Sequence, residues 1–316
     1  MNIASNGENK QLNIKTITYG DLTWVDIVEP TEEAIKYLGQ NYKLNPLDLD
    51  DCVSSRQLPK LETYLEYIFV IFHLPVYDKT KRLSTRKQWS AFVGEKYLIT
   101  LRPGELKSLD ALFRQCELSE ESRKEYMTQG SGYLLYRILD RAIDSYFPVL
   151  NTILSLMEDI EDNVFNDEIE AGKDISILQR DIITQRRVMF PTRALFIDLG
   201  KRLGRFSQTN LTLYFNDLLD HMNKIADTLD EFREVIDVYK DADYILSDYR
   251  ANRVMRILAV LGIIGLPFLL ITGLFSMHIV LPGGLDTSPT VFYVLLGVML
   301  AIVLGLLYFL RRRRML

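Results

Sequence analysis

Hydrophobic residues form two long uninterrupted runs near the C-terminal end of the chain, at 257–277 and 291–310. Each run holds about 20 residues, which is the length that a helix needs to cross a hydrocarbon core of roughly 30 Å. The short segment 278–290 joins the two runs. The pattern therefore predicts a tight hairpin of two transmembrane helices at 257–277 and 291–310, connected by a loop at 278–290.

Basic residues flank this predicted hairpin on one side only. Arg250, Arg253 and Arg256 precede the first run and a cluster of arginines follows the second, whereas the loop carries no Lys or Arg. Because positively charged flanks tend to stay in the cytoplasm, we expect a multi-pass protein of the cell (inner) membrane with an extracytoplasmic loop and both termini cytoplasmic. The basic tail, 311–316, then lies at the lipid headgroups.

A pattern typical of strands occurs in the first part of the chain. Residues 14–28 alternate apolar and polar side chains, and the segment 67–101 contains β-branched and aromatic runs broken by turn residues. Short helices are expected after Pro30, where acidic residues occupy the first turn, and at 45–53. We therefore expect a cytoplasmic α/β domain at 1–130.

From 131 to 256 the hydrophobic pattern predicts long helices and no strands. One amphipathic helix is expected at 131–165 and a second at 175–203. A third helix, expected to continue into the first membrane span as a stalk, has apolar residues at spacings of three and four. Its seam can pack inside one chain, between subunits, or both. The seam residues are Phe215, Leu218, Met222, Ile225, Leu229, Phe232, Ile236 and Tyr239.

The remaining composition excludes several kinds of chemistry. The net charge is -5, and the two cysteines, Cys52 and Cys116, form no CxxC pair, so no disulfide is expected. His73, His221 and His278 lie in different predicted elements without zinc-site spacing, and neither a P-loop nor a GxGxxG motif occurs. We therefore expect no enzyme, and no nucleotide or nucleic acid as a partner.

Acidic residues are dense along the predicted stalk between 217 and 248. Such a run usually forms a solvated face of a helix. If several stalks pack side by side, however, facing carboxylates repel each other unless a cation lies between them, and hard divalent ions such as magnesium prefer oxygen ligands. The acidic stalk therefore indicates a physical route to cation sensing.

Several motifs occur in the order that one family uses. NRVMRILAVLGIIGLPFLLITGLF precedes the loop, the second span and the basic cluster, and YLLYRILDRAIDSYF, RRVMFPTR, ADTLDEFRE and NPLDLDDCVSSRQLPKLE lie upstream. On these motifs the chain resembles the CorA family of magnesium channels, also called two-span GxN transporters, over nearly its whole length. The resemblance implies an α+β membrane protein that forms a funnel-shaped homopentamer, in which the first span lines one axial pore and the second faces lipid.

The resemblance also implies where ions pass and where they are sensed. By position, Asn252 corresponds to a polar ring at the cytoplasmic mouth, and Asp241 corresponds to an acidic ring just below it. Asp51, with Asp50, corresponds to a regulatory metal site at the subunit interface, and Asp217 corresponds to its partner on the neighbouring stalk. In the family, magnesium bound there holds the pentamer closed. The implied pore-lining residues are Asp241, Asn252, Met255, Leu258, Gly262 and Leu266.

The family's Gly-Met-Asn motif at the outer mouth appears here as Ser276, Met277 and His278. A histidine ring offers fixed nitrogens, becomes charged near pH 6.5, and suits zinc better than magnesium. The leading hypothesis is a divalent-cation channel in which Mg2+ is both transported and regulatory, gated by cytoplasmic divalent binding between subunits. One alternative keeps the scaffold but carries zinc, cobalt or protons. Another is a membrane sensor or interaction protein that does not conduct.

Overall fold

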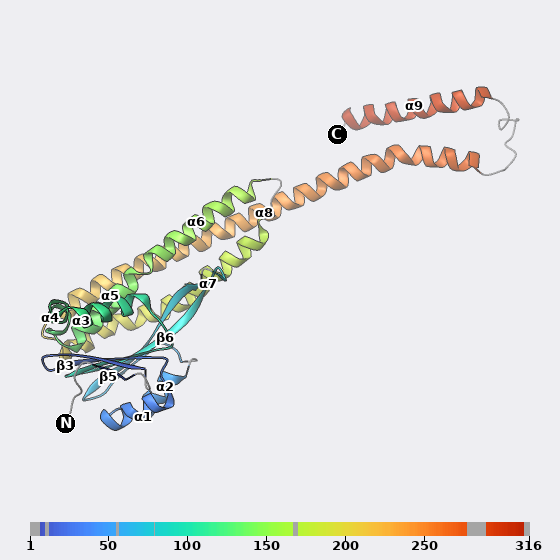
Figure 1. Cartoon of the computed structure of the whole chain (residues 1–316). Helices are drawn as coiled ribbons and strands as arrows, with labels where there is room; N and C mark the ends of the chain where they lie inside the picture. The colour runs from blue at the N-terminus through green and yellow to red at the C-terminus, as the bar shows by residue number, and fades with distance from the viewer. Residues whose placement is uncertain are drawn as a thin grey trace. The chain divides into compact units, whose positions relative to one another are not determined.

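The computed structural model describes residues 7–9, 13–54, 57–78, 80–166, 170–276 and 289–312. The chain divides into two compact units, Met1–Lys240 and Asp241–Leu316. The first unit contains the sheet and the helices that pack on it, and the second contains only helical segments among its described residues (Figure 1). One helix, α8, runs from Leu211 to Ser276 and contributes residues to both units.

The strands among the described residues form one seven-stranded sheet in the order β1-β2-β3-β7-β6-β5-β4. β3 and β7 are parallel, with Val25 opposite Ile99, and the other neighbouring strands are antiparallel. The predicted alternation at 14–28 corresponds to β2 and β3, so the sequence period located this edge of the sheet. The bounds are β1 Gly7–Asn9, β2 Ile14–Tyr19, β3 Leu22–Val28, β4 Lys60–Thr63, β5 Tyr67–Asp78, β6 Leu83–Gly94 and β7 Tyr97–Arg102.

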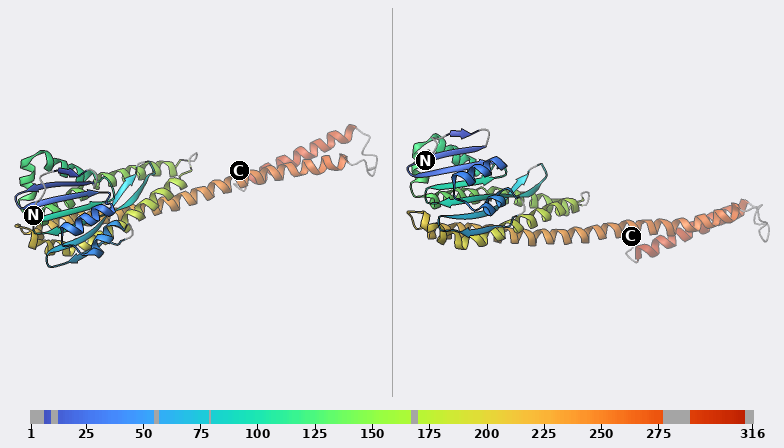
Figure 2. Two further views of the ribbon diagram at one scale, coloured as in Figure 1. Left: turned by 60° about the horizontal axis from the view of Figure 1, so that its bottom comes forward. Right: turned by 90° about the horizontal axis from the view of Figure 1, so that it is seen from below.

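Helices cover both faces of the sheet (Figure 2). On one face, Leu38 of α1 and Leu49 of α2 share a buried core with Ile71 of β5. On the other face, Phe72 of β5 packs against Phe196 of α7. Because successive strand residues point to opposite faces, these neighbouring side chains place the α1–α2 pair and α7 on opposite sides of the sheet. The bounds are α1 Glu32–Asn41, α2 Pro46–Val53, α3 Lys107–Leu118, α4 Glu120–Met127 and α7 Gly172–Leu203.

The segment that the sequence predicts as one helix, 131–165, is two helices, α5 (Ser131–Asp144) and α6 (Phe147–Val164). Pro148 lies in the first turn of α6. In a continuous helix its ring would collide with the carbonyl group of Asp144, and its missing N–H would leave that carbonyl without a partner. The single-helix prediction was therefore wrong at this position, and the proline is the reason.

The apolar seam of α8 lies inside a single chain. All the seam residues from Phe215 to Ile236 are buried, and the Phe215 ring contacts Tyr136 of α5 and Phe196 of α7. Tyr239, the last seam residue, is half-buried and donates a hydrogen bond to Glu161 of α6 at 2.7 Å. The chain's own helices thus supply partners for this seam, and packing inside one chain was one of the arrangements that the heptad pattern left open.

The second unit contains the apolar part of α8 and the helix α9, Pro289–Arg312. Within the described residues, one helix is long and apolar enough to cross a membrane, and it lies in α8, within Leu211–Leu270. Helix α9 is 24 residues long and contains the apolar stretch Leu296–Gly305. Its membrane-crossing role stays a prediction.

Candidate metal-regulatory site

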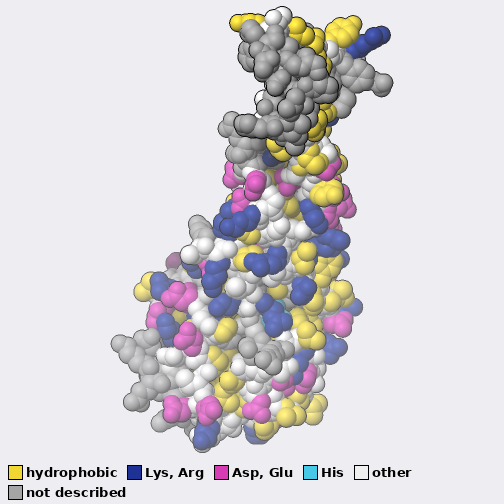
Figure 3. Space-filling view, turned by 90° about the vertical axis from the view of Figure 1, so that its right-hand side faces the viewer, with side chains coloured by type: hydrophobic (Ala, Val, Ile, Leu, Met, Phe, Trp, Pro, Cys, Tyr) yellow, Lys and Arg dark blue, Asp and Glu magenta, His cyan; other side chains and the backbone are white. Residues whose placement is uncertain are grey.

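Helix α2 carries two of the acidic residues that the sequence assigns to regulation. Asn45 caps this helix, since its side-chain oxygen accepts the Leu47 N–H at 3.0 Å, and Pro46 occupies the first turn, where its missing N–H costs nothing. Asp50 is exposed and Asp51 is half-buried. Acidic and basic side chains are interspersed over the face that Figure 3 presents. Neither sign of charge dominates that face.

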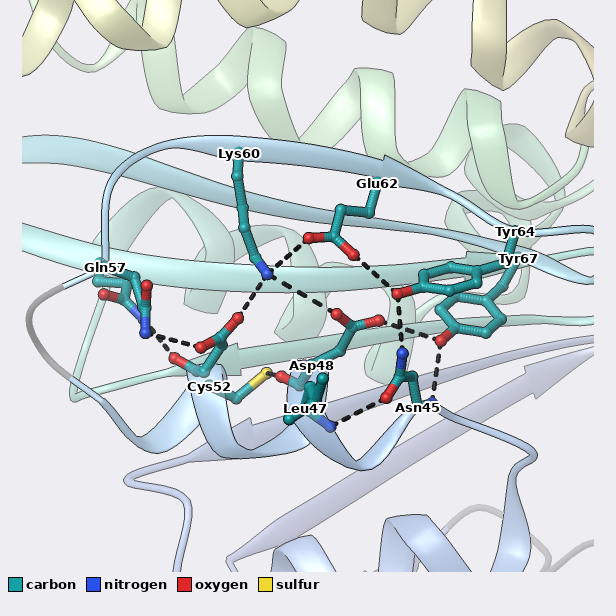
Figure 4. Close-up of polar contacts among 11 residues, drawn as sticks. Asn45, Leu47, Asp48, Cys52, Gln57, Lys60, Glu62, Tyr64 and Tyr67 are labelled. Atoms are coloured by element: carbon teal, nitrogen blue, oxygen red, sulfur yellow. Dashed lines mark hydrogen bonds and ion pairs between the residues drawn. The ribbon is translucent and has the colours of Figure 1, made fainter.

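The side chain of Lys60, from β4, lies among the acidic residues of this region (Figure 4). Its Nζ atom is 2.9 Å from Glu62 Oε1 and 3.7 Å from Asp48 Oδ1, and it pairs directly with Asp51 Oδ2. Gln57 Nε2 donates to the other carboxylate oxygen of Asp51 at 2.6 Å. We call Asp48, Asp51, Glu62 and Lys60 the α2 cluster.

Two stacked tyrosines border the α2 cluster (Figure 4). The hydroxyl of Tyr67 donates to Asp48 Oδ2 at 3.1 Å, and that of Tyr64 donates to Glu62 Oε2 at 2.7 Å. The two ring centroids are 4.6 Å apart, and Asn45 donates to both hydroxyl oxygens, at 3.0 and 3.1 Å. Each of these two carboxylates therefore has a neutral donor besides the ammonium group.

Burial and charge act in opposite directions on the groups of the α2 cluster. Asp48 is 1% exposed, and its burial raises the pKa of its carboxyl group. The hydrogen bond from Lys60 lowers the pKa of Glu62. Burial disfavours the ammonium charge of Lys60, but hydrogen bonds to Asp51 and Glu62 outweigh it and raise the pKa of the lysine. The lysine therefore stays protonated and faces three carboxyl groups.

The sequence reasoning selected Asp51 for this site but omitted Asp48, Lys60 and Glu62. A signal was present in the Q-x-P-K-x-E turn. Lys60 and Glu62 are two positions apart, so a short strand places both on the same face. A cation and a carboxylate on one strand face, close in sequence to an acidic helix, could have indicated an ion-pair network.

Asp217, the third predicted regulatory residue, is exposed on α8. This helix packs with α5 and α7, on the face of the sheet opposite to α1 and α2. One chain therefore does not bring Asp217 together with Asp50 or Asp51.

A second group of possible metal ligands lies one turn along α8 from Asp217. His221 meets Asp140 and Asp144 of α5, and the possible ligand atoms of these three residues all lie within 4.8 Å of one another. His221 Nδ1 is 3.6 Å from Asp144 Oδ1, and burial, followed by the charge of Asp144, raises the pKa of Asp140. A set of one imidazole and two carboxylates suits a borderline cation such as zinc or cobalt. The four-residue spacing of the aspartates was its sequence signal.

The implied pore residues lie on the part of α8 that belongs to the second unit. Asn252 Nδ2 donates to Asp248 Oδ2, one turn earlier, at 3.0 Å. Ser276 ends α8, whereas Met277 and His278 lie outside the described residues. The pore and filter roles therefore stay predictions. The residues of α8 that are exposed in the single chain include Asp241, Asn252, Met255, Leu258, Gly262 and Leu266.

A mixed α/β domain whose last helix continues into a segment apolar enough to cross a membrane is typical of the class of membrane proteins that carry a large folded domain outside the lipid. Within that class, the chain belongs to the CorA family. The family model described as "CorA-like Mg2+ transporter protein" matches residues 19–312. The resemblance seen in the sequence motifs is thereby confirmed.

Individual relatives match most of the chain. The YfjQ protein of Bacillus subtilis is 26% identical, covering 94% of this chain and 92% of its own length. The cobalt/magnesium transport protein CorA of Thermotoga maritima is 25% identical, covering 81% and 73%. The complete structure of the CorA magnesium transporter from Methanocaldococcus jannaschii has a TM-score of 0.76 at 22% identity, covering 94% and 92%. This structure shows a shared fold.

The names of the relatives mention different transported ions. The zinc transport protein ZntB of Pectobacterium atrosepticum is 24% identical, covering 71% of this chain and 66% of its own length. The family places the chain among divalent metal-ion transporters rather than enzymes. The expectations of metal-ion transport and of no enzymatic activity are therefore confirmed, and the choice of ion is a separate question.

Proposed function

We propose that this protein is a homopentameric channel that passes divalent cations, magnesium first, across the cell membrane. The observation that carries the proposal is the extent of the family match, which includes both the α/β domain and the apolar part of α8. A single pair of spanning helices cannot enclose a water path, because each helix must bury its surface or face lipid. Several copies of α8, with Asn252 and Met255 toward a common axis, supply the pore.

The proposed topology places α9 as the second span and both termini in the cytoplasm of the inner membrane. Its support is the arginine distribution, with Arg250, Arg253 and Arg256 before the first apolar segment and Arg311 and Arg312 at the end of α9. The loop between the two helices then faces the outside.

The proposed regulation uses Mg2+ between neighbouring chains. Asp50 and Asp51 of one chain face Asp217 of the next, and the separation of α2 and α8 within one chain is what makes a neighbour necessary. Carboxylate oxygens are suitable ligands for magnesium. A bound ion stabilises the closed pentamer, and its loss lets the carboxylates repel one another, which shifts the population toward the open state.

The transported ion depends on the filter, and a second cargo has specific support. Ser276, Met277 and His278 replace the family's Gly-Met-Asn motif, and a zinc transport protein is among the relatives. An imidazole ring can hydrogen-bond the waters around magnesium, but as a direct ligand it favours zinc or cobalt. Zinc or cobalt transport on the same scaffold is therefore the second candidate function.

Ion flux into proteoliposomes tests both candidates. The fluxes of Mg2+, Co2+, Zn2+ and Na+ through the purified protein are compared at about one pH unit on either side of 6.5, the ordinary pKa of histidine. Magnesium flux that internal magnesium inhibits supports the leading proposal. Zinc flux that His278→Asn abolishes supports the second candidate. The absence of flux for every ion contradicts both candidates and leaves a membrane sensor that does not conduct.

A further inference from the structure

The ammonium group of Lys60 occupies the position that a cation takes among carboxylate ligands. It contacts Asp48, Asp51 and Glu62 together, and its Nζ atom also lies 5.1 Å from the centroid of the Phe69 ring. The lysine side chain is 26% exposed. It therefore has an open side toward which its flexible stem can move.

The carboxylates of the α2 cluster are held by partners other than the lysine. Tyr67 donates to Asp48, Gln57 donates to Asp51 and Tyr64 donates to Glu62. The carboxylates would therefore keep these hydrogen bonds if the ammonium group moved away.

The charge of the α2 cluster favours a divalent cation over the single ammonium group. Three carboxyl groups face one ammonium group, so the acidic side chains of the cluster outnumber its single cation. A magnesium ion carries two charges and prefers oxygen ligands. The donor set thus fits the regulatory ion of the proposed function, and the lysine acts as its stand-in.

We propose that Lys60 is a tethered competitor of the regulatory divalent cation. The cation can bind the carboxylate of Asp51 only when the ammonium group of Lys60 moves aside. This inference rests on the proposed regulation through Asp50, Asp51 and Asp217. An internal competitor lowers the fraction of sites that are free to bind, and it raises the apparent dissociation constant by the same factor. Lys60 thereby sets the cytoplasmic magnesium concentration at which the channel closes.

The test measures how much Mg2+ protects the cytoplasmic domain from a protease. Full-length protein in detergent is titrated with Mg2+ alone, and the concentration that gives half-maximal protection is compared between wild type and Lys60→Met. We expect that concentration to fall roughly tenfold in Lys60→Met, because a hydrogen bond to a charged group is worth about a factor of ten or more in an equilibrium.

Two matched variants separate competition from a general effect of losing charge. Lys60→Arg keeps a cation in the cluster, so its half-protection concentration is expected to be no lower than that of wild type. Lys43→Met removes a lysine that is 88% exposed and 4.0 Å from Glu66, and it is expected to change nothing. Thermal unfolding without magnesium shows whether Lys60→Met is folded, and Lys60→Gln serves as a second neutral variant with the same expected fall.

Each outcome has a separate meaning for the two proposals. The role of Lys60 is overturned if Lys60→Met and Lys60→Gln need as much Mg2+ for half-maximal protection as wild type does, or more. It is also overturned if Mg2+ protects none of the variants. If magnesium flux into proteoliposomes persists in either case, the transport function stands without this regulation. If wild type passes no ion, the transport function fails independently of the protease result.

Discussion

Arg102 ends strand β7 in the interior of the α/β domain, where 1% of its side chain is exposed. Its Nη2 atom lies 2.8 Å from Asp26 Oδ2 and 2.5 Å from Asp110 Oδ1, and its Nη1 atom donates to Gly104 O at 3.0 Å. Burial disfavours the guanidinium charge, but the hydrogen bonds to Asp26, and then to Asp110, raise the pKa of Arg102. The arginine thus compensates the carboxylate of Asp26, which is 0% exposed.

Arg102→Met removes this compensation and keeps an apolar stem of similar length. Asp26 then retains the hydrogen bond from Thr100 Oγ1 at 2.7 Å but loses the guanidinium group that contacts both of its carboxylate oxygens. Removing one partner of a buried ion pair costs about 3–5 kcal/mol. For a unit of this size each kcal/mol lowers the melting temperature by about 2–4 °C, so we expect a fall of roughly 6–20 °C.

The assay uses the two tryptophans of the chain, Trp24 and Trp89, which are buried in the same domain at 0% and 1% exposure. Their fluorescence is followed during thermal unfolding of the full-length protein in detergent. The control is Arg82→Met, which breaks an ion pair with Asp174 whose side chains are 44% and 36% exposed, and which should cost at most about 1 kcal/mol. A loss for Arg102→Met no larger than that of this control would refute the reasoning.

Two further predictions concern the same domain. A Cβ atom on Gly200 of α7 would lie 2.6 Å from Phe215 Cβ of α8. Gly200→Ala is therefore expected to lower stability by about 1–3 kcal/mol, whereas Gly204→Ala, which meets nothing within 4 Å, should not; equal melting temperatures would contradict this. Burial, with the charge of Arg86, lowers the pKa of His73 from 6.5 to about 4. The unfolded chain takes up this proton first, so stability should fall as the pH drops from 6.5 toward 4, by up to about 3 kcal/mol, and denaturant titrations at several pH values should show a smaller fall in His73→Gln.

Local patterns located most of the elements of this protein. The alternation at 14–28 indicated β2 and β3, and the spacing of Phe215 to Tyr239 indicated the packed face of α8. Strand β4, Lys60–Thr63, is too short to give a periodic signal. The break between α5 and α6 was missed although Pro148 marks it, because the amphipathic pattern continues across the proline.

The candidate site was predictable only in part, because a local pattern does not show which distant residues come into contact. The acidic character of α2 is a local property, and Asp50 and Asp51 could be selected from it with the help of the family motifs. The pairing of Asp51 with Lys60, and the meeting of His221 with Asp140 and Asp144, join elements that are separate in the sequence. The four-residue spacing of Asp140 and Asp144 marks one side of the second contact, but no spacing along the chain encodes either pairing.

The sequence by itself determined the class of this protein, because hydrophobic length, charge asymmetry and motif order are properties of the chain before it folds. It left open which helices pack on the apolar seam of α8 and which side chain of the same chain contacts Asp51. The tertiary structure decided both questions. The seam packs on α5 and α7 of the same chain, and the ammonium group of Lys60 lies against Asp51. The physical reason is that partners of this kind are fixed by the packing of distant segments, which no local period specifies.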